Sequence, residues 1–119
     1  MNGFRDLLVW QKGMELVTLV YSLIKLFPKD EQYALASQVK RSAVSIPSNI
    51  AEGFGRRHKQ DYIRFLEIAR SSLYELQTQL EIARNVNFIK DQDLNQVFVM
   101  CHELEKMLNS FIKTIDSSK

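Results

Sequence analysis

The most informative stretch of the chain spans residues 41–56 and reads Arg41-Ser42-Ala43-Val44-Ser45-Ile46-Pro47-Ser48-Asn49-Ile50-Ala51-Glu52-Gly53-Phe54-Gly55-Arg56. It places a proline, two glycines and a row of polar side chains inside an otherwise helical sequence. Apolar residues recur here every three to four positions, which predicts a helix with one buried face; they are Leu35, Val39, Ala43, Ile46 and Ile50. Pro47 removes one backbone hydrogen bond and crowds the carbonyl of Ala43, so we expect a bend near residues 43–47.

The same periodicity, followed outward from this stretch, predicts four helices. We expect them over residues 5–27, from Glu31 to about residue 53, over 58–87 and over 91–116. Pro28 ends the first, Asp30 is a good N-cap for the second, and Gly53 and Gly55 are natural terminators. No alternating β pattern of useful length occurs. The sequence therefore predicts an all-α fold, an antiparallel up-down-up-down four-helix bundle with residues 1–119 in a single domain.

The composition is that of a globular protein. Of the 119 residues, 45% are hydrophobic and 25% are charged, which fits one domain with its own core. The net charge of +2 excludes a uniformly basic nucleic-acid binder, so any basic function must come from local clustering. No apolar run reaches the ~20 residues that span a bilayer, and no signal-peptide pattern is present. With Cys101 as its one cysteine, the chain is expected to be cytoplasmic, without a membrane partner.

The first helix is apolar over an unusually wide arc, roughly 240° of its circumference at 100° per residue. A four-helix bundle buries only part of such an arc, and a large apolar patch that stays outside usually marks an interface. We therefore expect a homo-oligomer whose contact includes Trp10, Leu16, Leu19 and Leu23. The alternative is a first helix that lies deep in the monomer.

A row of polar residues, called the polar row below, follows the second helix away from its apolar face: Gln38, Arg41, Ser45, Asn49 and Glu52. Their spacing of three or four makes them neighbours on a helix. Three interpretations remain open: a solvated face, a ligand site, or an interface with another subunit or a partner protein. The interface hypothesis uses Arg41, Ser45, Asn49 and Glu52, and it pairs Arg41 with Glu52 across a subunit boundary.

Positive side chains cluster where the second helix gives way to the third. This basic corner consists of Arg56, Arg57, His58, Lys59 and Arg64. Free N–H groups and the helix dipole at the start of the third helix add to its attraction for anions, and a phosphate backbone is the obvious large anion. Phe54 and Tyr62 could stack on bases or belong to the core. The alternative is a solvated loop that helps solubility.

No catalytic or metal motif is recognisable. Cys101, His102 and Glu103 are neighbours in the sequence, but on a helix they diverge by 100° each, with Cys101 on the core face and His102 outside. No Glu-x-x-His pair and no glycine-rich phosphate loop occurs. The sequence therefore predicts no catalytic residue, no metal, no cofactor and no enzymatic activity.

Four segments together resemble a known family: residues 4–12, Phe27-Pro28, residues 38–56 and residues 69–76. The chain is similar to the four-helix bundle proteins encoded in 23S rRNA intervening sequences. This resemblance implies a bacterial homopentamer, related to the accessory protein of diversity-generating retroelements, a pentameric barrel that engages a reverse transcriptase and nucleic acid. The family pattern falls on Arg41, Ser45, Pro47, Asn49, Glu52, Gly53, Gly55, Arg56 and Glu75, and it implies no catalytic role for them.

We therefore expect a non-enzymatic, homo-oligomeric accessory factor that binds RNA or DNA through a repeated basic corner. The alternative function is a protein-protein scaffold that docks a partner polypeptide on the polar face of the second helix.

Overall fold

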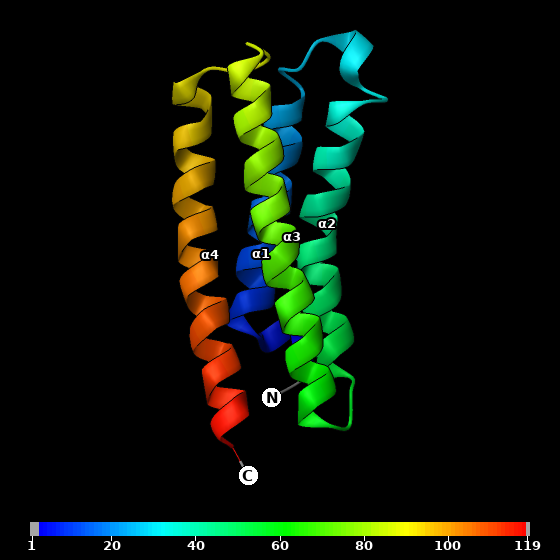
Figure 1. Ribbon diagram of the computed structural model, residues 1–119, viewed down its shortest axis with the longest axis vertical. Coiled ribbons are helices and arrows are strands. Elements are labelled where there is room, and N and C mark those ends of the chain that lie inside the picture. The colour runs from blue at the N-terminus through cyan, green and yellow to red at the C-terminus, as the bar shows by residue number, and fades with distance from the viewer. Residues whose placement is uncertain (1–2, 119) are drawn as a thin grey trace.

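The computed structural model describes residues 3–118. They form four α-helices, which are α1 Leu8–Ile24, α2 Leu35–Phe54, α3 Lys59–Asn85 and α4 Asp91–Ser117, and two short 3-10 turns at Phe4–Asp6 and Lys29–Glu31. The helices alternate in direction along a bundle of 49 × 24 × 22 Å (Figure 1). Each helix packs against the next one in the chain, and α4 packs against α1. The predicted all-α four-helix bundle is confirmed.

One hydrophobic core runs the length of the bundle. The apolar stripe of α3 is buried from Leu66 to Ala83, and that of α4 from Leu94 to Leu108. The most extensive packing is between α2 and α3, where small buried residues face inward: Ala36, Ser42, Ala43 and Gly53 on α2, and Ala69, Ser72 and Ala83 on α3. Small side chains let two helices approach closely.

The start of the second helix differs from the prediction. Asp30 is not an N-cap, because it lies in the 3-10 turn Lys29–Glu31, and α2 begins only at Leu35. The intervening N–H groups bond three residues back, from Glu31 to the carbonyl of Pro28 and from Ala34 to that of Glu31. These bonds hold the chain in tight turns and delay the α-helix. The first helix is also shorter than predicted, because residues 4–6 form the other 3-10 turn.

The third helix ends on an asparagine in the left-handed region. Asn87 has a φ of 66°, and its N–H donates to the carbonyl of Arg84 while that of Phe88 donates to the carbonyl of Ala83. This is the Schellman arrangement, in which asparagine can replace glycine. It ends α3 at Asn85, two residues before the predicted limit.

Pro47 is buried and lies within α2, which stays helical on both sides of it. The bend expected there stays a prediction. On the neighbouring helix Gly13 faces this proline, since a β-carbon on Gly13 would lie 3.5 Å from Cβ of Pro47. This is an ordinary van der Waals distance, so α1 packs next to Pro47 without requiring glycine at position 13. Within residues 3–118, no helix combines the length and apolar character that a membrane span needs.

Candidate nucleic-acid interface

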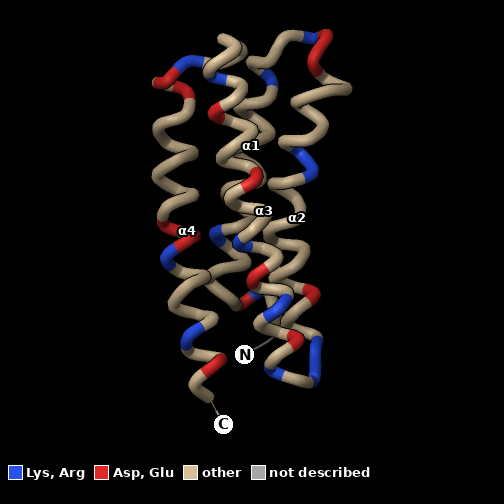
Figure 2. The backbone as a smooth tube through the Cα atoms, in the orientation of Figure 1, with Lys and Arg blue, Asp and Glu red and all other residues tan. Residues whose placement is uncertain are grey.

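The basic corner comprises the turn between α2 and α3 and the first two turns of α3, at the end of the bundle that also holds the start of α1 and the end of α4 (Figure 1). Arg56, Arg57, His58 and Arg64 are exposed, and Lys59 is half-buried. Residues 52–64 hold four arginines and lysines against two acids, so this segment alone carries an excess of positive charge equal to the net charge of the chain, +2. Figure 2 shows the positive residues gathered in this turn.

Two of the predicted residues, Arg56 and Arg64, both lie over the aromatic ring of Phe65. The guanidinium carbon of Arg56 lies 4.7 Å from the centroid of Phe65, and that of Arg64 lies 4.8 Å from the same centroid. Each arginine also has a carboxylate, with Nη2 of Arg56 3.1 Å from Glu52 Oε1 and Nη2 of Arg64 3.6 Å from Asp61 Oδ1. Both side chains are therefore held in place while remaining open to solvent.

Lys59 has a different role from the other basic residues. Its Nζ donates to the backbone carbonyls of Asp116 at 2.9 Å and Ser118 at 2.5 Å. A cation at the carboxyl end of a helix is favoured by the helix dipole. Lys59 thus ties the start of α3 to the end of α4. The prediction that treated it as a freely available phosphate contact missed this link, because the contact joins residues far apart in sequence.

Phe54 and Tyr62 pack inside the corner rather than offering their faces to bases. Their rings meet edge to face at 6.3 Å, and Tyr62 meets Phe111 of α4 in the same way at 5.9 Å. The hydroxyl of Tyr62 is buried without a hydrogen-bond partner among the described residues, and burial raises the pKa of Tyr62 to about 12. Of the two interpretations of these aromatic residues, the structure favours the core one.

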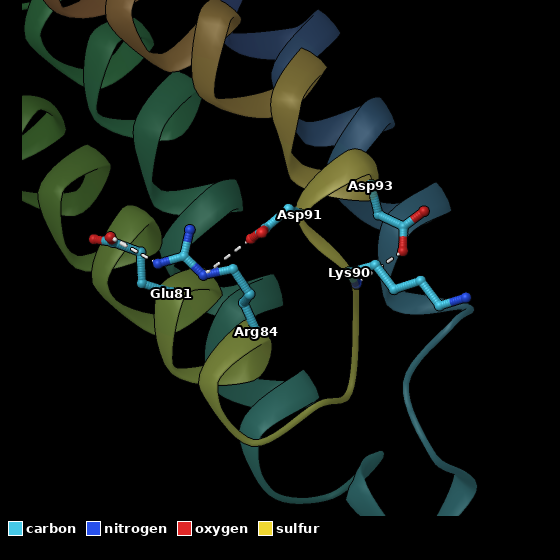
Figure 3. A network of polar contacts seen from close by, with 5 residues as sticks. All are labelled: Glu81, Arg84, Lys90, Asp91 and Asp93. Carbon is cyan, nitrogen blue, oxygen red and sulfur yellow. Dashed lines mark hydrogen bonds and ion pairs between the residues drawn. The ribbon is translucent and has the colours of Figure 1, made fainter.

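The opposite end of the bundle is more evenly charged. Arg84 lies between two carboxylates, with Nη2 3.4 Å from Glu81 and Nε 3.5 Å from Asp91 (Figure 3). Next to it, the backbone N–H of Lys90 donates to Asp93 at the start of α4. Arginine and lysine at this end are therefore interleaved with acids, which leaves the α2–α3 turn as the better anion site.

The apolar arc of α1 divides between core and surface. Two of the residues predicted at a subunit contact are wrong for that role, because Leu16 and Leu23 are only 0% and 6% exposed and pack in the core of the subunit. Trp10 and Leu19 are half-buried. The exposed apolar side chains of α1 are instead Leu8, which is 70% exposed, and Met14 and Tyr21, each 42% exposed.

Met14 lies on one side of a shallow groove between α1 and α2. It has a volume of about 390 Å³ and is lined by Trp10, Met14, Val17, Val44, Pro47, Ser48 and Ala51. With Tyr21, which lies one turn beyond Val17, we call this surface the apolar α1–α2 face. Its α1 residues belong to the wide apolar arc and remain exposed or half-buried in the subunit.

The polar row also divides. Ser45 and Asn49 are half-buried, since Ser45 Oγ lies 2.8 Å from Ser72 Oγ of α3 and Nδ2 of Asn49 donates to Ser45. One turn away, Ser42 Oγ lies 2.8 Å from Gln79 Oε1 and 3.1 Å from Glu75 Oε1. These six residues form a polar seam between α2 and α3, so the interface role predicted for Ser45 and Asn49 gives way to contacts within the subunit. Ser42, Ser72 and Gln79 were not foreseen, although polar residues on otherwise apolar stripes were the available signal.

The ends of the polar row stay at the surface. Glu52 and Arg41 are exposed. Glu52 pairs with Arg56 of its own chain, so the predicted pairing of Arg41 with Glu52 across a boundary would have to compete with that bond. A cross-subunit role for Arg41 stays a prediction.

Cys101, His102 and Glu103 diverge as expected. Cys101 is fully buried, whereas His102 and Glu103 are exposed. Burial, with a smaller effect of Glu105, raises the pKa of the Cys101 thiol to about 12. This thiol is therefore a core side chain that stays protonated at neutral pH.

Comparison with known proteins agrees with this fold. No match was found among curated proteins. A crystal structure of a protein with unknown function from the S23 ribosomal protein family of Bacteroides thetaiotaomicron is similar, with a TM-score of 0.82 and 26% sequence identity, covering 89% of this chain and 99% of that chain. Residues 5–110 match the family model of the 23S rRNA-intervening sequence protein. Because that match spans most of the sequence, the chain belongs to the 23S rRNA-intervening sequence protein family.

Proposed function

We propose that this protein is a non-enzymatic, homo-oligomeric accessory factor that binds RNA or DNA through its basic corner. The observation that carries the proposal is the cluster of Arg56, Arg57 and Arg64 at one exposed end of the bundle, with two of the guanidinium groups held over Phe65. Phosphate contacts by such groups supply most of the sequence-independent affinity for nucleic acid.

The test replaces these arginines with glutamines and measures binding of a short labelled duplex, DNA and RNA in parallel, by fluorescence anisotropy. The triple variant Arg56→Gln, Arg57→Gln, Arg64→Gln should weaken binding and lower its salt dependence, because fewer counterions are released. Lys59 is left intact, since it holds the end of α4.

A matched control removes the same charge from the other end of the bundle, with Lys25→Gln, Lys29→Gln and Lys90→Gln. All three lysines are exposed. If the control weakens binding as much as the arginine variant, binding depends on overall charge and the proposal for the corner is wrong. If neither set changes binding, the nucleic-acid function itself is wrong.

The homo-oligomer is supported by the apolar α1–α2 face. Apolar side chains on neighbouring helices remain exposed there, including Met14, Tyr21 and Val44, the last 41% exposed. Covering such a surface with a second copy would also repeat the basic corner, and several linked weak sites bind far more tightly than one. The pentamer, the relation to the retroelement accessory protein and the cytoplasmic location stay predictions.

Light scattering at low and high salt tests the assembly. The wild-type mass should be a multiple of the chain mass, and Met14→Glu with Tyr21→Glu should reduce it to one chain. The control, Ile82→Glu with Val99→Glu, changes apolar residues on α3 and α4 that are at least as exposed as Met14 and Tyr21, and it should leave the mass unchanged. A wild-type monomer at both salts would contradict the proposal.

The second candidate function is a scaffold that docks a partner polypeptide on the polar face of α2. It loses support because Ser45 and Asn49 are hydrogen-bonded within the seam, which leaves exposed Arg41 as its main anchor. A partner retained after nuclease treatment and lost in Arg41→Ala would favour the scaffold instead.

A further inference from the structure

We propose that Phe65 is a positioning residue that presents Arg56 and Arg64 together to the phosphate groups of a nucleic-acid backbone. This role rests on the nucleic-acid binding proposed above. It explains how the side chains of Arg56 and Arg64 are held in the basic corner.

The two arginines come from different elements and share one support. Arg56 follows the end of α2, whereas Arg64 and Phe65 belong to α3. Both guanidinium carbons lie within 5 Å of the Phe65 centroid, at 4.7 and 4.8 Å. This is the range in which an arginine is attracted to the face of an aromatic ring. The half-buried ring is therefore a single contact that the two like-charged groups share.

The sequence around residues 52–56 explains how Arg56 reaches the ring. A β-carbon at Gly53 would lie 2.8 Å from Cβ of Phe65, so only glycine lets Phe65 pack this closely against α2. The N–H of Arg56 donates to the carbonyl of Gly53 at 3.0 Å, which turns the chain back on itself. Glu52 then holds the guanidinium from the side, at 3.1 Å. Gly53 thus allows the close approach of Phe65, and Glu52 holds Arg56 beside the ring.

This arrangement leaves the arginines ready to bind. A guanidinium has five N–H donors, and the Glu52 contact of Arg56 uses Nη2 alone. An arginine also loses considerable rotamer freedom when it is fixed on a ligand. Stacking on Phe65 restricts that freedom before the phosphate arrives, so less is lost on binding.

The experiment compares Phe65→Leu with Phe65→Tyr in the anisotropy assay over a series of salt concentrations. Loss of the ring should weaken binding by about fivefold to tenfold, from two cation–π contacts. The dependence on salt should stay as in the wild type, because no charge is removed. Phe65→Tyr keeps the ring and should bind as the wild type does. Arg56→Gln, by contrast, should lower the salt slope by about one.

Several outcomes would overturn the inference. Wild-type binding by Phe65→Leu would do so, as would an equal loss in Phe65→Tyr. Circular dichroism checks that each variant is folded, and Phe65→Met, which lacks the ring but fills similar space, replaces Phe65→Leu if that variant unfolds. If the triple arginine variant also binds normally, the proposed function has failed; if only Phe65→Leu binds normally, this inference alone has failed.

Discussion

A β-carbon on Gly53 would lie 2.8 Å from the β-carbon of Phe65. It would also lie 3.0 Å from Cδ1 of Tyr62. The first of these atoms is fixed directly to the backbone of α3, so it cannot move aside by a change of rotamer. The backbone of the last turn of α2 therefore packs directly against the side chains of Tyr62 and Phe65 on α3. Gly53 makes this close approach possible because it has no side chain. Its conformation alone does not require glycine, since Gly53 lies within a regular helix.

Replacing Gly53 with alanine should destabilise the protein by about 1–3 kcal/mol, the usual cost of overpacking. Alanine is favoured over glycine inside a helix by about 1 kcal/mol. A decrease in the free energy of unfolding would therefore show that the steric clash outweighs this preference. Urea denaturation of Gly53→Ala and wild type gives the difference in free energy of unfolding.

The matched control is Gly13→Ala on α1. A β-carbon there would meet Pro47 and Ile46 at 3.5 and 3.6 Å, which is ordinary contact. This variant should be more stable than the wild type by about 0.5–1 kcal/mol. If both alanine variants shifted stability in the same direction, the packing argument for Gly53 would be wrong.

The polar seam should couple α2 and α3 energetically. Ser45 and Ser72 face one another at 2.8 Å, and a hydrogen bond of this kind contributes about 0.5–1.5 kcal/mol. A double-mutant cycle with Ser45→Ala and Ser72→Ala should give a coupling energy in that range. The hydroxyls of Thr78 and Thr114 donate to backbone carbonyls of their own helices, so a cycle of Thr78→Ala and Thr114→Ala should give no coupling energy. Equal coupling in both cycles would refute the seam.

The four helices could be predicted from sequence because their apolar stripes repeat at helical spacing over many turns. Periodicity could not say which half of the wide arc of α1 faces the core. Leu16 and Met14 are both large apolar residues within the arc, yet Leu16 is buried and Met14 is exposed. The difference is set by the way α1 packs against α2 and α4. The start of α2 was missed for a related reason, since the choice between a 3-10 turn and an α-helix after Pro28 depends on contacts beyond the local sequence.

The position of the candidate site could be predicted from sequence, because the positive residues of the basic corner are close together in the chain. The separate roles of these residues could not be predicted, because they depend on contacts between segments that are distant in sequence. Lys59 meets the end of α4, and Arg56 meets Phe65 only because α2 and α3 fold against one another.

Lys59 should stabilise the end of α4. Replacing it with methionine keeps the apolar stem but removes the donor to the carbonyls of Asp116 and Ser118. The loss should be about 0.3–1 kcal/mol, typical of a cation at a helix carboxyl end. Amide hydrogen exchange should be faster than in the wild type in the last turn of α4 and unchanged in α1. Lys113→Met, which changes an exposed lysine on the same helix, is the control, and equal fraying in both variants would contradict the tether.

Stability should fall as the solution becomes alkaline, and Tyr62 allows the cause to be isolated. Burial raises the pKa of Tyr62 from 10.0 to about 12, and that of Cys101 from 9.0 to about 12. Between these limits the unfolded chain has lost protons that the folded chain keeps, so the free energy of unfolding decreases with rising pH. The stabilisation is complete below about pH 9 and is lost progressively towards pH 12.

The variant Tyr62→Phe removes a buried hydroxyl that has no hydrogen-bond partner among the described residues. It should therefore be at least as stable as the wild type at pH 7, by up to about 1 kcal/mol, because an unsatisfied buried group is costly. Its stability should also fall less steeply between pH 10 and 12 than that of the wild type. Tyr33→Phe supplies the baseline, since Tyr33 is 98% exposed. Denaturation curves at a series of pH values measure both effects. If Tyr62→Phe were less stable than the wild type at pH 7 and its stability fell as steeply above pH 10, the hydroxyl of Tyr62 would be hydrogen-bonded or solvated.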